Sequence, residues 1–259
     1  MSAIADTARA GELSAVVTGI RLPFCVMNEA GFATNTSDIR ALARSRSGAV
    51  VLMPMTVHPF VHPGFRALNN PGFDKMLPLV RDLVATDRPV VASVVGATID
   101  ELGVLAKAFA GAGCAAIEVD LGDPWLTATL APFESVETFA AVAARVAAEA
   151  SPRPVWVKLP ERVPASYAEI VPILINAGVR AIVSTADFQG FEKLLLEAPR
   201  SLDVIVRGQF PTGYDVSRTI AKGVRAVQLA ASMRNEGVGV FGRLEREMRK
   251  ATERPGTGA

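Results

Sequence analysis

Both histidines of the 259-residue chain, His58 and His62, lie in the stretch "MPMTVHPFVHPG". A four-residue spacing would place two imidazoles on one face of a helix, where they could bind a metal ion together with carboxylates. However, Pro59 and Pro63 directly follow the histidines, and a residue before proline is disfavoured in the helical region. The sequence therefore predicts an extended or turning loop and assigns no metal ligands, since a metal site would need Asp120, Asp123 or Glu29 to converge with the histidines. One of its histidines could still act as an acid or base at neutral pH.

Charged residues also fall at the ends of short apolar runs. Lys158 is the next-to-last residue of "PVWVKL", and Arg207 is the next-to-last residue of "DVIVRG". Asp120 lies at the end of "AAIEVDL", and Asp123 follows it. A lysine in such a place must either form an ion pair, with Glu118 or Asp120, or bind an anionic ligand. The residues alone leave both alternatives open.

The elements that must position these groups follow a repeated pattern. Short runs rich in Val, Ile and Ala are typical of strands that are buried on both faces. They occupy residues 24–28, 49–53, 89–95, 115–121, 154–159, 180–185, 203–208 and 225–230. Segments with helical spacing separate them. Eight such units predict an α/β protein consisting of a single-domain (β/α)8 TIM barrel. An open doubly wound sheet would require a Gly-rich fingerprint after the first strand, which is absent.

A barrel of this kind carries its active site at the carboxyl ends of the strands. The intervals after the second and fourth strands are the longest, and the extra residues fall in the loops at that end. One of these loops contains both histidines, and the other contains Asp123. We therefore expect Lys158, Arg207, Asp120 and these two loops to surround one mouth.

Composition limits the partners. The formal net charge is +1, which gives no reason to expect nucleic acid or a membrane surface, and no apolar run is long enough to span a bilayer. The start of the chain lacks a signal-peptide pattern, which predicts a cytoplasmic protein. We expect residues 1–22 to lead into the barrel, 23–250 to form it and 251–259 to be a disordered tail. Cys25 and Cys114 each lie in or beside an apolar run, which predicts buried thiols.

Several segments, in order, resemble the soluble dihydroorotate dehydrogenases along nearly the whole chain. "PFCVMNEAGFATNTSDI" is similar to the first strand and turn of that family, and "ALNNPGFDKML" resembles its "GLPNPGFD" segment. "AAIEVDLGDP" stands where the family has "ELNLSCPN", and "PVWVKLPE" is a close match. "VIVRGQFPTGYDV" and "AVQLAASMRNEGVGVFGRL" resemble the segments that follow.

The resemblance implies an FMN oxidoreductase of the CH–CH class, with the flavin across the mouth and a small-molecule substrate above it. It implies that the flavin contacts are Asn28, Lys158, Ser184, Arg207 and Gly208. The resemblance also implies which residues lie near the substrate: Asn70, Asp120, His58 and His62. Asp123 stands in the position of the family's catalytic base, and Lys158 has a catalytic role as well. Relatives often dimerise through loops near the mouth, so a homodimer is an expected assembly.

The sequence departs from the family at several of these positions. Met53 replaces a lysine, and Gln209, Ala230 and Ala231 replace residues of the phosphate site, where added side chains obstruct close approach of the backbone. An acidic Asp120 would repel the carboxylate of orotate, so orotate is not the expected substrate.

Two other functions therefore stay open. One is a flavin-free barrel enzyme, a lyase, isomerase or transferase acting on a small phosphorylated or cationic molecule. The other is a non-catalytic relative, since fold alone does not fix function. Asp123 has two interpretations as well. It is either a general base whose pKa is raised by burial and by the neighbouring Asp120, or a loop carboxylate that caps a turn beside Pro124.

Overall fold

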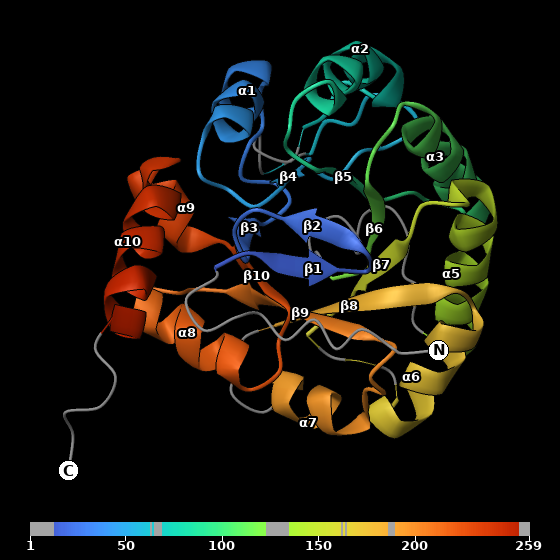
Figure 1. The fold of residues 1–259 in the computed structure, drawn as a ribbon. Coiled ribbons are helices and arrows are strands. Elements are labelled where there is room, and N and C mark those ends of the chain that lie inside the picture. The colour runs from blue at the N-terminus through green and yellow to red at the C-terminus, as the bar shows by residue number, and fades with distance from the viewer. Residues whose placement is uncertain are drawn as a thin grey trace.

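The computed structural model describes residues 13–62, 64, 69–122, 135–161, 163, 165–185 and 190–253. Eight parallel strands form one sheet in the order β3-β10-β9-β8-β7-β6-β5-β4 (Figure 1). They are β3 (Val26–Asn28), β4 (Val50–Val51), β5 (Val90–Val94), β6 (Ala116–Asp120), β7 (Val155–Lys158), β8 (Val179–Thr185), β9 (Asp203–Gly208) and β10 (Ala226–Leu229). Each lies within one residue of a predicted strand, and the predicted (β/α)8 barrel is confirmed.

Helices surround this sheet (Figure 1). They are α1 (Thr36–Arg44), α2 (Phe73–Val84), α3 (Ile99–Gly111), α5 (Val136–Ala150), α6 (Tyr167–Asn176), α7 (Gly190–Glu197), α8 (Gly213–Ala221), α9 (Ala231–Glu236) and α10 (Gly239–Glu253). Several of these helices begin with an N-cap residue: the side chains of Thr98, Ser135 and Thr212 accept hydrogen bonds from backbone amides of the first turn of α3, α5 and α8. Helix α10 continues to Glu253, and residues 254–259 of the expected tail lie outside the described residues. Among the described helices, none is long and apolar enough to cross a membrane.

A side chain completes the barrel where the first and second strands meet. The strand ladder does not join β3 to β4, but the Asn28 carboxamide bridges them. Its Oδ1 accepts from the Val51 amide at 2.9 Å, and its Nδ2 donates to the Val51 carbonyl at 2.6 Å. The Gly48 amide adds a bond of 2.7 Å to the Val26 carbonyl. Asn28 thus imitates the backbone of a neighbouring strand, because a carboxamide carries the same donor and acceptor as a peptide group.

We expect Asn28→Ala to lower the free energy of unfolding by about 2–4 kcal/mol, because it leaves the buried Val51 amide and carbonyl without partners. Urea denaturation measures this. The control is Asn176→Ala at the exposed end of α6, which should change stability by less than about 0.5 kcal/mol. Equal effects of the two substitutions would show that the carboxamide does not hold the seam.

A β-hairpin covers one end of the barrel. Strands β1 (Ala15–Val17) and β2 (Ile20–Leu22) pair antiparallel, and Figure 1 shows them lying across the centre of the ring. The hairpin turns at Thr18 and Gly19, both at positive φ. The Trp156 indole donates to Thr18 Oγ1 at 3.0 Å, and the Thr18 amide donates to Asp203 at 2.6 Å. The segment 13–22 therefore closes the barrel interior rather than only leading into it.

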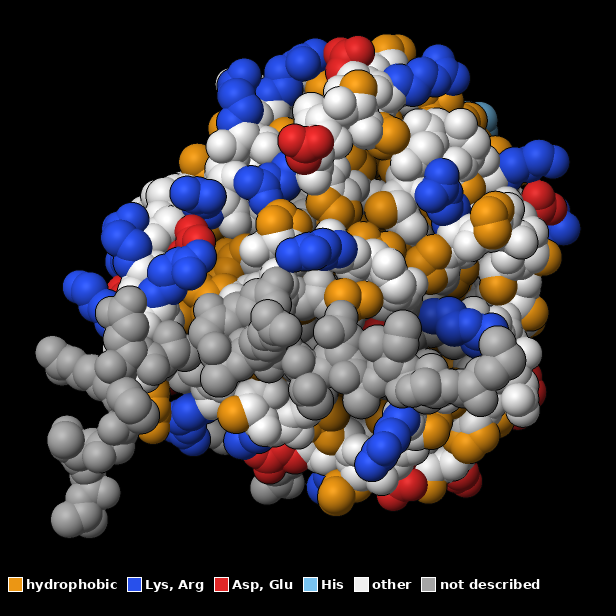
Figure 2. Space-filling model, in the orientation of Figure 1, with side chains coloured by type: hydrophobic (Ala, Val, Ile, Leu, Met, Phe, Trp, Pro, Cys, Tyr) orange, Lys and Arg blue, Asp and Glu red, His pale blue; other side chains and the backbone are white. Residues whose placement is uncertain are grey.

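The buried apolar side chains of the barrel form two clusters. The larger one fills the space between sheet and helices, and a smaller one inside the barrel includes Val17, Leu22, Val51, Trp156 and Ile205. Both cysteines are free and buried, as predicted. Figure 2 shows the hairpin face, on which Lys and Arg side chains stand apart from one another rather than gathering in one patch.

Candidate active site

The barrel interior changes from apolar to charged towards the carboxyl ends of the strands. Alternation along β6 points Ala116, Glu118 and Asp120 to the same side of the sheet, and Ala116 belongs to the interior cluster. Strand register places Asp120 beside Lys158 and Arg207 beside Gln228. The interior therefore ends in ionisable side chains instead of the branched apolar residues that usually fill a barrel.

Lys158 lies at the centre of this charged group, with only 2% of its side chain exposed. Its ammonium donates to Asp120 Oδ2 at 3.0 Å and lies 3.2 Å from Glu29 Oε1. Arg207 Nη1 donates to the same Glu29 oxygen at 2.9 Å. Burial works against the charge on Lys158, but the carboxylates of Asp120, Glu29 and Glu118 outweigh it and raise its pKa. Lys158 is thus a fixed cation at neutral pH.

A second polar pair lies within the barrel on β6 and β10. Gln228 Nε2 donates to Glu118 Oε2 at 2.6 Å, and both residues are completely buried. Burial raises the pKa of Glu118 to about 7, and the carboxylates of Asp120 and Glu29 add to the rise. Lys158 and the hydrogen bond from Gln228 act in the opposite direction. Glu118 therefore titrates in the neutral range, which suits an acid or base.

The loop after β4 presents a different set of polar groups. Phe60 and Asn70 form an antiparallel bridge within it. Thr56 Oγ1 lies 2.7 Å from Asn70 Oδ1, which also accepts from the Gly72 amide at 3.1 Å. The Asn70 Nδ2 atom is buried and has no hydrogen-bond partner among the described residues. It is a donor that a ligand could satisfy.

The two histidines of this loop differ in their surroundings. His58 is exposed, whereas His62 is 9% exposed and its Nδ1 accepts from the Gly64 amide at 3.1 Å. Its own amide donates to Asn69 Oδ1 at 2.8 Å. Within the part of the chain that is described, no group of three or more His, Cys, Asp or Glu side chains could hold a metal ion. These two hydrogen bonds indicate that His62 stabilises the conformation of the loop after β4.

The other residues singled out in the sequence are scattered around the mouth. Ser184 is buried in β8, and Gly208 ends β9. Asn28 uses its carboxamide at the barrel seam, so any flavin contact would come in addition to that structural role. Met53 is 2% exposed and packs in the outer apolar core. Asp123 lies outside the described residues.

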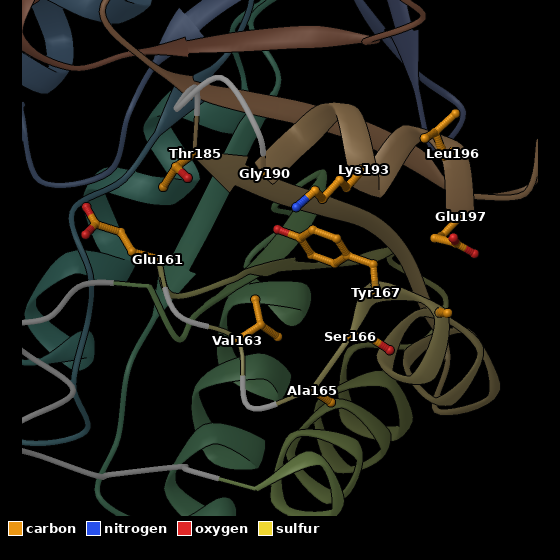
Figure 3. Close-up of a pocket in the computed structure, with 11 residues that line it drawn as sticks. Glu161, Val163, Ala165, Ser166, Tyr167, Thr185, Gly190, Lys193, Leu196 and Glu197 are labelled. Atoms are coloured by element: carbon orange, nitrogen blue, oxygen red, sulfur yellow. The ribbon is translucent and has the colours of Figure 1, made fainter.

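A separate cavity of about 490 Å³ opens beside the mouth, between the β7–α6 connection and α7 (Figure 3). Thr185, at the end of β8, and Glu161 lie at its inner side, and Figure 3 shows the Tyr167 hydroxyl pointing towards the Lys193 ammonium. Its charged lining residues, Glu161, Lys193 and Glu197, are exposed to solvent. The cavity is therefore distinct from the buried ion network.

Sequence reasoning placed Asp120, Lys158 and Arg207 together but did not pair Glu29 with either cation. The Lys158–Asp120 pair is one of the two that the sequence suggested, whereas Glu118 bonds to Gln228 instead. Glu29 pairs with both cations and was not among the expected contacts. Its position directly after the first strand was the available signal, since inward-facing residues there meet at the mouth.

Comparison with known proteins supports the fold. No family model matches the sequence, and no curated protein matches it. Among solved structures, the crystal structure of the dihydroorotate dehydrogenase (DHODH) of Eimeria tenella in complex with ferulenol is similar, with a TM-score of 0.80 and 15% sequence identity. The match covers 96% of this chain and 86% of that chain. The chain therefore has a DHODH-like (β/α)8 barrel fold.

Proposed function

We propose that this chain is a DHODH-like flavin oxidoreductase whose substrate is neither dihydroorotate nor orotate. The observation that carries the proposal is Lys158, which lies buried at the end of β7 between Glu29 and Asp120. A lysine at this strand end is what the sequence resemblance implies for a flavin contact, and the barrel matches a DHODH over 96% of the chain. The function rests on this site and not on the fold alone.

The charges at the mouth favour an uncharged substrate. Glu29 and Asp120 carry two negative charges, which Lys158 and Arg207 balance. No surplus cation remains in this group to bind a substrate carboxylate, whose desolvation would then be uncompensated. The buried atoms Asn70 Nδ2 and Arg207 Nε are donors that have no hydrogen-bond partner among the described residues. We therefore propose a neutral substrate that presents carbonyl oxygens to them.

The donors of this chain fit FMN at two places. The Lys158 ammonium has three N–H groups. One donates to Asp120, and the ammonium also forms an ion pair with Glu29, so at least one N–H is available within the described site for a ring acceptor. Helix α9 begins directly after β10 without a side-chain cap, and the register of β9 and β10 brings it beside Gly208. Its first-turn amides are donors for a phosphate, although the side chains of Ala230 and Ala231 narrow the approach to them. When bound, FMN would accept the hydride that the substrate loses.

The remaining roles belong to the protein. Asp123, at the position of the family's base, would take the substrate proton, and Asn70 would orient a carbonyl oxygen. Asp120 would hold Lys158 in place and, with His58 and His62 on the loop above, would border the substrate. Asn28, Ser184, Arg207 and Gly208 would border the flavin. A cytoplasmic protein, a homodimer and an absence of nucleic-acid partners stay predictions from the sequence.

The absorbance spectrum of the purified protein tests this function. We expect a yellow protein that releases FMN on denaturation, or a colourless one that quenches the fluorescence of added FMN with a 1:1 end point. Candidate dihydro-substrates should then bleach the bound flavin. Asp123→Ala should slow bleaching at least about 100-fold without weakening FMN binding, as expected for loss of a general base. The control is Asp100→Ala, a carboxylate that is 88% exposed on α3, which should not alter the rate.

A flavin-free barrel enzyme is the second candidate, and one observation favours it. Met53, at the position of the family's flavin-contacting lysine, is buried in the apolar core, so it supplies no second cation. In this case the acid–base set of Lys158, Glu118 and Asp120 would act directly on a small substrate. A folded, colourless protein that does not bind added FMN would reject the flavin proposal and leave this one.

A further inference from the structure

The buried pair of Glu118 and Gln228 spans the barrel interior. Strands β6 and β10 are separated by three strands on one side of the ring and three on the other, so their hydrogen bond crosses the barrel. Ser93 lies on β5 in direct register with Glu118. Three buried oxygens of this group, Ser93 Oγ, Glu118 Oε1 and Gln228 Oε1, have no partner among the described residues. Glu118 Oε1 and Gln228 Oε1 are acceptors, and Ser93 Oγ can donate or accept. Leaving buried acceptors without a donor costs free energy unless a proton or another donor reaches them.

The charge balance points to a proton. Glu29, Glu118 and Asp120 would carry three negative charges if all were ionised, against the two positive charges of Lys158 and Arg207. Glu29 and Asp120 each contact a cation directly, whereas within the described part of the chain Glu118 forms a hydrogen bond only with the uncharged amide of Gln228. A carboxylate in this position is the least compensated of the three. A proton on Glu118 makes the group neutral and converts Oε1 into a donor.

We propose that Glu118 is a specificity-determining residue that keeps its proton beneath the mouth and so holds the charged cluster neutral. With the proton present, the mouth accepts uncharged ligands without a charge penalty. When the O–H bond breaks and the proton leaves to solvent, the cluster gains one negative charge and disfavours anions. Glu118 acts through the charge of the site and does not need to touch a ligand. This proposal uses only groups of this chain and does not depend on a flavin.

The pKa of Glu118 depends on which charged and uncharged groups each surrounding strand brings into the barrel interior. Charged groups reach it from β7 (Lys158), β6 (Asp120) and the residue after β3 (Glu29), and Arg207 on β9 lies beside its partner Gln228. From the other strands only uncharged groups enter the interior: Ser93 on β5, Val51 on β4 and Val183 on β8. Burial, the largest influence, raises the pKa of Glu118 to about 7. The proton is therefore held at pH 6 and lost by pH 8.

The direct test is an NMR titration of side-chain carboxyl carbons in wild-type protein and in Glu118→Gln. We expect one carboxyl signal to titrate between pH 6 and pH 8 and to be missing from the variant. Glu192→Gln, a half-exposed carboxyl on α7, is the control and should leave that signal in place. If no carboxyl of the wild type titrates in this range, the proposal is overturned.

Thermal unfolding gives a second test that does not need an assignment. A carboxyl whose pKa is raised on folding contributes stability that is present below its unfolded pKa and is lost as pH rises through the folded value. Wild-type protein should therefore lose melting temperature relative to Glu118→Gln between about pH 4.5 and pH 7, and the difference should then level off. A constant difference overturns the proposal. So does a wild-type melting temperature that rises with Na⁺ or K⁺ but not with acid, because a metal cation would then supply the positive charge.

Discussion

Lys158→Met should destabilise the protein by about 3–5 kcal/mol, the usual cost of removing one partner from a buried ion pair. The ammonium is 2% exposed and lies within 3.2 Å of both Glu29 and Asp120. Methionine has a similar length but takes the ammonium away from two buried carboxylates, of which Glu29 keeps its ion pair with Arg207 and Asp120 keeps the hydrogen bond from the Gly122 amide. Denaturant-induced unfolding at pH 7 measures the loss.

Two controls separate lost charge from lost packing. Lys107→Met removes an ammonium that is 78% exposed in its pair with Glu149, and it should change stability by less than about 0.5 kcal/mol. The triple substitution Lys158→Met, Glu29→Gln and Asp120→Asn removes the uncompensated carboxylates as well. It should recover a large part of the loss, because neutral replacements carry a smaller desolvation cost. A triple variant less stable than Lys158→Met would contradict the ion-pair account.

Gly48→Ala, which adds a single methyl group, should lower the free energy of unfolding more than the same change at any other described glycine of the barrel. A Cβ at this position would lie 1.8 Å from the Phe24 carbonyl oxygen and 2.9 Å from its carbonyl carbon. Both are backbone atoms, so no side-chain rotation relieves the overlap. The Gly48 amide also bonds to the Val26 carbonyl at 2.7 Å, which fixes the close approach at the β3–β4 seam. We expect a loss of roughly 4–5 kcal/mol or failure to fold, at the extreme of single-substitution effects.

The matched control is Gly111→Ala at the end of α3, where an added Cβ would meet no atom within 4 Å. Alanine is a better helix former than glycine, so this variant should be neutral or more stable by about 0.5–1 kcal/mol. Urea unfolding of both variants gives the comparison. If Gly48→Ala unfolds at the same urea concentration as Gly111→Ala, the seam must be able to open at little cost.

The eight strands and the helices between them could be read from the sequence because their signals are local. Apolar runs such as "AIEVD" mark doubly covered strands, and caps such as Thr98 mark where helices start. The same alternation put Glu118 and Asp120 on one face of their strand. The hairpin of residues 15–22 was missed because its two strands have only three residues each, too few for a periodic signal. Its turn at Thr18 and Gly19 was the only local sign.

The partners of the buried charges were decided only by the closed barrel. Lys158 and Glu29 come from strands on opposite sides of the ring, and Glu118 and Gln228 are 110 residues apart in the chain. No local pattern encodes such pairs, because they arise only when strand tilt and register bring opposite walls within reach of one side chain. The sequence determined the barrel, its mouth and most of the charged residues at it. The tertiary structure decided that Glu29 joins both cations and that Glu118 is left with an uncharged partner, since closure sets which buried charges must compensate one another.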